Sequence, residues 1–285
     1  MPSADPARAD PAVIAVDTHA HIFATGLPLA EVRRYAPTYD ATAEDYLARL
    51  DAHGVRCGVI VQPSFLGTDN SYMLQALRRY PDRLRGIAVV EPDISSAELE
   101  ALDAAGVVGI RLNLQRLPIP MFTKGPWPGF LAKLRRLDWQ VEIIRDSGDL
   151  PFLVEPLLDA GVNVVVDHFG RPAAEAGTDD PGFQYLLSRG SSRRVWVKLS
   201  GGYRNWADAD VSHHGRQAAA LLLEAMGPER LVWGSDWPHT QNEERVTFAS
   251  TQQDLVDWVP DAGDRRIIVQ DTALRLFRFN LPAAA

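Results

Sequence analysis

Short runs of apolar, mostly β-branched residues alternate along the chain with longer stretches whose apolar residues recur at helical spacing. The runs predict eight strands, at residues 13–16, 56–61, 85–90, 108–112, 140–144, 163–166, 194–199 and 231–233. The stretches between them predict helices at residues 43–53, 71–80, 97–105, 130–137, 150–160, 183–189 and 216–226. Nearly continuous apolar strands separated by helices are typical of a parallel sheet buried on both faces, and eight such strands close a barrel. We therefore expect an α/β protein with a (β/α)8 TIM-barrel fold in a single domain.

The alternative is a doubly wound open sheet, which normally has a glycine-rich turn after its first strand. The turn here contains two histidines and no glycine, at residues 17–21. We assign residues 1–12 to a loose N-terminal tail and residues 13–281 to the barrel domain.

Two further features belong to the connections. A long proline-rich loop at residues 115–128 follows the fourth predicted strand. After the eighth strand, the pattern predicts an extra helix at residues 242–258 and a final helix at residues 272–279.

Ionisable residues gather where the predicted strands end, which is where a TIM barrel builds its active site. Alternation along an extended strand places Asp17, His19 and His21 on one side. His168 follows the sixth strand and Asp236 follows the eighth. We predict that His19, His21, His168 and Asp236 are the catalytic residues; the alternative is that they only satisfy backbone groups of the loops.

A second set of polar residues suits substrate binding. Arg111 ends the fourth strand and Arg204 lies in the loop after the seventh, and a guanidinium matches a planar carboxylate through two parallel hydrogen bonds. Lys198, Ser200 and Tyr203 surround the end of the seventh strand. The arginines have an alternative role in surface salt bridges. Lys198 has three alternatives: a partner of Asp236, a substrate contact, or half of a buried ion pair.

Charge and composition restrict the partners. The formal net charge of −8 disfavours nucleic acid and an anionic membrane surface, because no basic field attracts them. The only cysteine, Cys57, lies in an apolar run and is interpreted as a buried filler. No apolar run approaches the roughly 20 residues of a membrane span, and the N-terminus lacks the pattern of a signal peptide. We expect a cytoplasmic enzyme; its oligomeric state cannot be read from the sequence.

Four motifs at matching strand ends carry a family resemblance. They are VDTHAHIF at 16–23, VDHFGRP at 166–172, VKLSGGYRNW at 197–206 and VWGSDWPHT at 232–240. Together they resemble the amidohydrolase superfamily of metal-dependent hydrolases, in the amidohydrolase-related branch that contains 2-pyrone-4,6-dicarboxylate lactonase and related lactone hydrolases. The resemblance extends to TALRLFRF at 272–279. It implies a lactonase-type hydrolase acting on a small anionic lactone, with arginines at positions 111 and 204 holding acidic groups of the substrate.

The sequence leaves the metal open. The His19–His21 pair, His168 and Asp236 form a possible mononuclear zinc site. The fifth strand contributes no histidine and the fourth contributes Arg111, a fixed cation that cannot ligate a metal. These departures from the superfamily's pattern exclude a binuclear site. The resemblance to 2-pyrone-4,6-dicarboxylate lactonase implies hydrolysis without a cofactor, which we favour, with one zinc or similar divalent ion as the alternative.

In the favoured hypothesis Asp236 takes a proton from the attacking water and returns it to the leaving oxygen. His19, His21 and His168 polarise the lactone carbonyl and stabilise the developing oxyanion. Such a role suits a carboxylate whose pKa is raised by burial. The alternatives are a mononuclear zinc hydrolase or non-oxidative decarboxylase on the same scaffold, and a catalytically silent binding protein.

Overall fold

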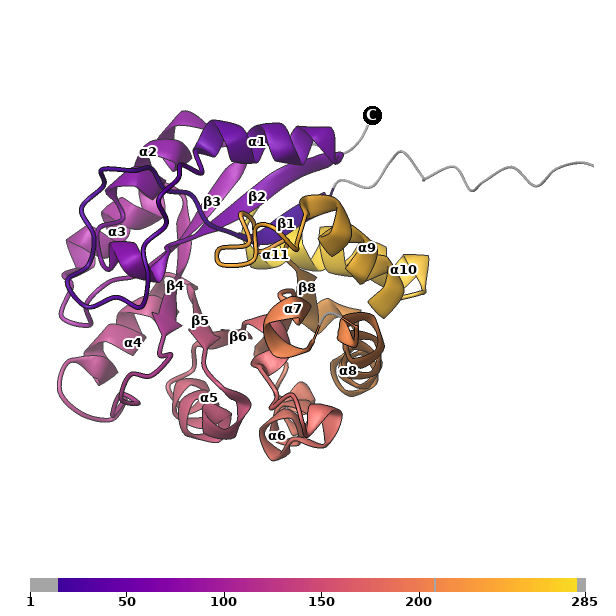
Figure 1. Cartoon of the computed structure of the whole chain (residues 1–285). Coiled ribbons are helices and arrows are strands. Elements are labelled where there is room, and N and C mark those ends of the chain that lie inside the picture. The colour runs from indigo at the N-terminus through magenta and orange to yellow at the C-terminus, as the bar shows by residue number, and fades with distance from the viewer. Residues whose placement is uncertain (1–14, 208, 281–285) are drawn as a thin grey trace, which may run out of the picture.

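The computed structural model describes residues 15–207 and 209–280 and has the predicted barrel architecture. Eight parallel strands are hydrogen-bonded in chain order, β1 to β8, and the helices lie outside them (Figure 1). The strands are β1 Ala15–Ala20, β2 Val55–Val61, β3 Leu84–Ala88, β4 Val107–Asn113, β5 Gln140–Ile144, β6 Asn163–Val166, β7 Val195–Leu199 and β8 Leu231–Trp233. The predicted TIM barrel in one domain is thus confirmed. The proposed tail at residues 1–12 and both ends of the proposed domain lie outside the described residues.

The helices follow the strands as expected, and two short ones, α7 and α10, were not predicted. They are α1 Ala43–Ala52, α2 Ser71–Arg79, α3 Ser96–Ala104, α4 Trp127–Arg136, α5 Leu150–Asp159, α6 Pro181–Ser188, α7 Gly202–Asn205, α8 Val211–Met226, α9 Phe248–Trp258, α10 Ala262–Arg266 and α11 Ala273–Leu276. Local sequence starts several of them. For α1, Thr42 and Asp45 form a capping box that satisfies free backbone N–H groups of the first turn.

The C-terminal helices differ from the sequence-based prediction. Helix α9 begins at Phe248 and not at residue 242, because Thr247 caps it in a reciprocal arrangement with Ser250. The final helical segment begins ten residues earlier than predicted, at α10, and a π-helix at Ile267–Thr272 joins α10 to α11. Its start was missed because Gly263 follows Ala262 and reads as a turn, although Asp261 provides an N-cap by accepting from Asp264 N–H.

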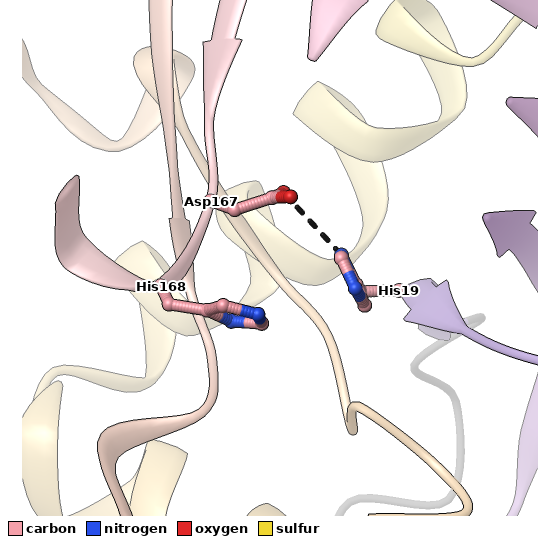
Figure 2. Close-up of side chains that lie close together, drawn as sticks. All are labelled: His19, Asp167 and His168. Atoms are coloured by element: carbon pink, nitrogen blue, oxygen red, sulfur yellow. Dashed lines mark ion pairs between the residues drawn. The ribbon is translucent and has the colours of Figure 1, made fainter. Parts of the chain in front are cut away.

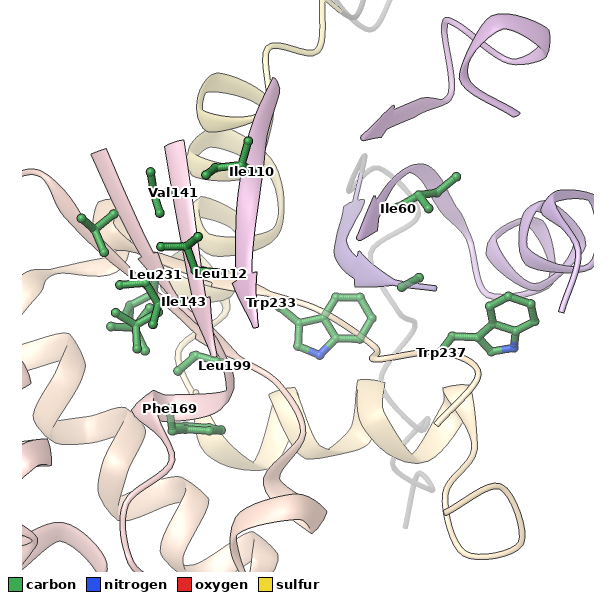
Figure 3. Close-up of a cluster of buried hydrophobic side chains, with 14 of the residues drawn as sticks. Ile60, Ile110, Leu112, Val141, Ile143, Phe169, Leu199, Leu231, Trp233 and Trp237 are labelled. Atoms are coloured by element: carbon green, nitrogen blue, oxygen red, sulfur yellow. The ribbon is translucent and has the colours of Figure 1, made fainter. Parts of the chain in front are cut away.

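The apolar core has two parts. The larger part packs the strands against the surrounding helices, and Figure 3 shows some of it, including Ile60 of β2, Ile110 of β4 and Val141 of β5. The smaller part comprises side chains of the first four strands and β8 together with the C-terminal segment, which contributes Phe277 and Phe279. Because apolar side chains fill these layers, polar side chains at the strand ends are held on a rigid frame.

The contact between β1 and β8 is narrower than the other strand pairings. The N–H of His21 donates to the carbonyl of Trp237 at 2.7 Å, and the N–H of Asp236 donates to the carbonyl of His19 at 2.8 Å. A single isolated parallel bridge, at Ala20, is assigned between these two parts of the chain in the described structure. The first and last strands thus meet at His19, His21, Asp236 and Trp237, which belong to the motifs at residues 16–23 and 232–240.

Asp17 does not share the surroundings of His19 and His21, contrary to the simple alternation. It accepts hydrogen bonds from the N–H and the hydroxyl of Ser235, at 2.8 and 2.5 Å. The pairing of β1 with β2 is irregular between Asp17 and Ala20, which breaks the period of two. Burial raises the pKa of Asp17 to about 6, although Ser235 opposes the shift.

Candidate active site

Asp236 lies at the centre of the polar cluster at the barrel mouth. It is 1% exposed, and its backbone adopts a left-handed conformation with φ of 60°. One carboxylate oxygen, Oδ2, accepts hydrogen bonds from the Tyr203 hydroxyl at 2.7 Å and from Nε of Arg204 at 2.5 Å. Burial alone would raise the pKa of Asp236, but the guanidinium of Arg204 is the largest opposing charge and holds the pKa well below its ordinary value. The carboxylate is therefore ionised, and the raised pKa considered from the sequence is wrong for the substrate-free structure.

His21 and His19 approach the other carboxylate oxygen of Asp236. Their Nε2 atoms lie 3.7 and 3.9 Å from Oδ1. Nδ1 of His21 lies 2.7 Å from the carbonyl of Val61, which can only accept, so this nitrogen carries the proton. Burial, helped by Arg111, lowers the pKa of His21 to about 4. Neutral His21 therefore presents a lone pair on Nε2 toward Asp236.

His168 approaches from the opposite side of the barrel. It directly follows β6 and Asp167, in a left-handed conformation with φ of 52°. Its Nδ1 lies 2.9 Å from the Ser200 hydroxyl, and Asn205 donates to its backbone carbonyl at 2.8 Å. Gly201 leaves room for the ring, because a Cβ there would lie 2.7 Å from Nδ1 of His168. Burial lowers the pKa of His168 to about 3, so the imidazole is neutral.

A second group of charges lies next to this cluster and is more deeply buried. Lys198 of β7 donates to Oε2 of Glu142 on β5 at 2.7 Å and lies 3.4 Å from Oδ1 of Asp167. Arg111 of β4 donates to Oδ2 of Asp167 through Nε and one terminal nitrogen, at 3.2 and 3.1 Å. Nδ1 of His19 lies 3.4 Å from Oδ1 of Asp167, as Figure 2 shows. Of the alternatives for Lys198, the buried ion pair is the one found.

Burial and neighbouring charges act differently on the two carboxylates of this group. Burial raises the pKa of Glu142 to about 7 even though Lys198 opposes the shift. For Asp167, burial is outweighed by the charges of Lys198 and Arg111, and its pKa is held well below the ordinary value.

The cluster opens into a small pocket at the mouth of the barrel. Its wall contains His21, Arg34, Tyr35, Pro63, Ser64, Arg111, Asn113, Gln115, Ile144, His168, Arg171, Arg204, Asp236, Thr240 and Gln241. Four arginines thus face one small space, which suits a substrate with several negative charges. Four of the predicted site residues do not line the pocket and lie behind the residues that do. They are His19, Lys198, Ser200 and Tyr203.

Several residues of the site were not assigned from the sequence. Asp167 stands beside His168, and Glu142 is the one acidic residue of the buried strand β5. The sequence could have identified both as site residues, because an acidic residue in or directly after an apolar strand is buried and requires a partner. Nothing in the sequence indicated that Arg34 and Tyr35 belong to the site, because they lie in the long connection between β1 and α1, which has no helix or strand.

Two groups of side chains have the composition of a metal site. They are His19 with Asp167 and His168, and His19 with His21 and Asp236; in each group the candidate ligand atoms lie within 4.8 Å of one another. Both groups depend on His19, whose Nδ1 is 3.1 Å from the ammonium of Lys198.

Comparison with known proteins decides the family. A sequence profile described as amidohydrolase matches residues 16–279. The chain belongs to the amidohydrolase family. It is 31% identical to a 4-sulfomuconolactone hydrolase of Hydrogenophaga intermedia, covering 92% of this chain and 88% of that one. It is also 31% identical to a 2-pyrone-4,6-dicarboxylate hydrolase of Comamonas testosteroni, covering 92% and 90%.

A solved structure gives the same result for the fold. It is described as a 2-pyrone-4,6-dicarboxylic acid hydrolase of Pseudomonas putida and is 45% identical to this amidohydrolase. The two superpose with a TM-score of 0.90, over 95% of this chain and 100% of that one. Among the described residues, no helix is long and apolar enough to cross a membrane.

Proposed function

We propose that this amidohydrolase opens a small lactone that carries carboxylate or similar acidic groups. The observation that carries the proposal is an ionised, buried Asp236 on the wall of a pocket that four arginines share. The predicted lactonase-type hydrolase agrees with the relatives, which are named for hydrolysis of anionic lactones.

Arg111 and Arg204 are proposed to hold the acidic groups of the substrate. Both side chains line the pocket, and each already pairs with a carboxylate: Arg111 with Asp167, and Arg204 with Asp236. A guanidinium has five N–H donors, so Arg111 retains free donors for a substrate carboxylate while it holds Asp167. Arg204 is 19% exposed and is the more accessible of the two.

Substrate binding is proposed to activate Asp236. In the free protein Arg204 keeps the pKa of Asp236 low, which makes it a weak base. A substrate carboxylate competes for the same guanidinium and weakens its hold on Asp236. The basicity of Asp236 then rises only when a substrate with the correct charge is present.

The reaction is proposed to proceed by attack of water on the lactone carbonyl carbon. Asp236 takes a proton from the water while the water oxygen forms the new C–O bond, and the carbonyl oxygen becomes an oxyanion. The ring C–O bond then breaks, and the leaving oxygen takes the proton from Asp236. The product is the ring-opened acid, and no electrons are exchanged with a cofactor.

The histidines divide these tasks differently from the sequence-based hypothesis. His168 lines the pocket and donates to the carbonyl oxygen when the Ser200 hydroxyl donates to its Nδ1. His21 presents a lone pair and therefore accepts a hydrogen bond from the attacking water instead of stabilising the oxyanion.

A divalent metal fits this arrangement poorly. The ammonium of Lys198 lies beside one imidazole of the candidate ligand set, and the guanidinium of Arg204 occupies Oδ2 of the candidate carboxylate. These fixed positive charges oppose a further cation. We therefore retain metal-independent hydrolysis as the proposal and the mononuclear zinc enzyme as its competitor, which the two His–Asp groups favour.

A hydrolysis assay with and without a chelator tests the proposal. The probes are 2-pyrone-4,6-dicarboxylate, 4-sulfomuconolactone and an uncharged lactone of similar size. We expect turnover of at least one acidic lactone, none of the uncharged control, and unchanged rates after chelation and removal of the chelated metal. Activity that disappears on chelation and returns with zinc would support the competitor, and binding without turnover of any lactone would overturn the hydrolase proposal.

A further inference from the structure

Lys198 is fully buried beside the active site and faces three acceptors. Its Nζ lies 2.7 Å from Oε2 of Glu142, 3.1 Å from Nδ1 of His19 and 3.4 Å from Oδ1 of Asp167. An ammonium group has three hydrogens and no lone pair. The number of its donors thus equals the number of acceptors around it.

These contacts determine where the proton of His19 lies. Nδ1 of His19 has two close neighbours: the ammonium of Lys198 at 3.1 Å, which can only donate, and Oδ1 of Asp167 at 3.4 Å, which can only accept. The contact with Lys198 is the shorter one and has hydrogen-bond geometry, so we assign Nδ1 as the acceptor. An imidazole whose Nδ1 accepts a hydrogen bond has no proton on that nitrogen, so the ring is neutral and carries a single proton. That proton is therefore on Nε2, which is buried and has no hydrogen-bond partner within the described part of the chain.

The position of this proton decides what the His19–His21–Asp236 group can hold. With the proton on Nε2 of His19, the group offers one donor together with the lone pairs of His21 Nε2 and Asp236 Oδ1. A water molecule complements such a set, because it accepts one hydrogen bond and donates two. With the proton on Nδ1, the same three atoms would all present lone pairs, which is the arrangement that binds a metal ion.

Without Lys198 the second arrangement is favoured. The closest remaining acceptor for His19 Nδ1 is the ionised carboxylate of Asp167, whose Oδ1 is 3.4 Å away. A proton on Nδ1 would donate to it, as metal-ligating histidines commonly do to carboxylates. Glu142 keeps Lys198 in place, since the two form a fully buried ion pair.

We propose that Lys198, held by Glu142, is a positioning residue that keeps the proton of His19 on Nε2 and so makes the His19–His21–Asp236 group a site for the attacking water instead of a metal ion. The part of this inference that concerns the water rests on the proposed hydrolysis. The position of the proton and the exclusion of metal do not depend on any substrate.

The test compares the wild type with Lys198→Met and with the double variant Glu142→Gln/Lys198→Met. The double variant removes both charges together, because removal of one leaves the other buried without a partner. Lys133→Met is the matched control: Lys133 lies on α4, is half-buried, and donates to the carbonyl of Ile94. Nitrogen NMR of labelled histidine reports the protonated ring nitrogen of His19, and titration with zinc alone reports metal affinity.

We expect the wild type and Lys133→Met to carry the His19 proton on Nε2 and to bind zinc weakly. In the double variant the proton should move to Nδ1, and zinc affinity should rise by about tenfold or more, within the range that neighbouring groups change metal affinity. On an acidic lactone, kcat should fall by roughly 10²-fold, the loss typical of one preorganised donor, with KM little changed. A wild-type proton on Nδ1, or a double variant with unchanged tautomer and zinc affinity, overturns the inference. A lack of turnover in every protein would contradict only the proposed function.

Discussion

Asp236 and Asp167 are two buried carboxylates on opposite sides of the same imidazole. Nε2 of His19 faces Asp236 and its Nδ1 faces Asp167. Each carboxylate is 1% exposed, follows a barrel strand, and is held by an arginine. The pKa of each is kept well below its ordinary value, against the effect of burial, by neighbouring positive charges.

The difference between them lies in what surrounds the arginine. Arg204 is partly exposed and lines the pocket with Asp236, so a ligand can draw it away. Asp167 is enclosed by Arg111, Lys198 and His19 and does not contribute to the described pocket wall. Two carboxylates with similar burial and similar pKa shifts can therefore serve different purposes: Asp236 is the proposed base, and Asp167 pairs with the buried charges of Arg111 and Lys198.

The largest expected effect is on the activity of Asp236→Asn. Removal of the proposed base should lower kcat by roughly 10³- to 10⁴-fold, at the upper end of general acid–base contributions. The free energy of unfolding should change little, because Arg204 can turn toward solvent. Steady-state kinetics on an acidic lactone and urea denaturation check the two parts, and an active variant would remove Asp236 from the mechanism.

Asp167→Asn should have its main effect on stability. It leaves Arg111 and Lys198 buried with one carboxylate fewer, and breaking a buried ion pair typically costs about 3–5 kcal/mol. Denaturant unfolding measures this loss. The control is Asp146→Asn, because the Asp146 side chain is 71% exposed and loss of its pair with Arg171 should cost less than about 1 kcal/mol. Equal stability of the two variants would contradict the structural role of Asp167.

The smallest expected effect is a displaced acid limit of activity. If neutral His21 accepts from the attacking water, activity requires its unprotonated form. Since its pKa is lowered to about 4, the loss of kcat/KM that His21 causes should come as the pH falls through about 4. Protonation of Glu142, whose pKa is raised to about 7, gives a separate change at higher pH, and a profile with no further fall near pH 4 would contradict the role of His21. The pH dependence of kcat/KM over the acid range provides the measurement.

The sequence predicted the fold well because each strand is a short apolar run bounded by polar residues or glycine. The sequence also predicted that His19, His21, His168 and Asp236 lie at one end of the barrel. His19 lies near the end of β1 and the other three follow strands, and the ends of parallel strands meet in a closed barrel. It did not predict the direction of the pKa shift of Asp236. That shift depends on Arg204, which is 32 residues away in sequence and turns back through the short helix α7.

Other failures have the same origin. Asp17 leaves the side of His19 and His21 because pairing with Ser235, 218 residues later in the chain, competes with local alternation. The partner of Lys198 is on β5, so only the closed barrel shows that it is Glu142. Single residues at strand ends could be identified, whereas the contacts that set their protonation are long-range.

The narrow contact between β1 and β8 has a consequence for how activity depends on folding. His19 and His21 belong to one side of this contact and Asp236 to the other, so the catalytic group exists only while the first and last strands are joined. These strands are far apart in the chain, and bringing them together carries the entropy cost of a long loop. A partial opening there would abolish turnover while the pairings from β2 to β7 stayed intact. Enzyme activity is thus a sensitive indicator that the whole chain, from its first strand to its last, has completed its fold.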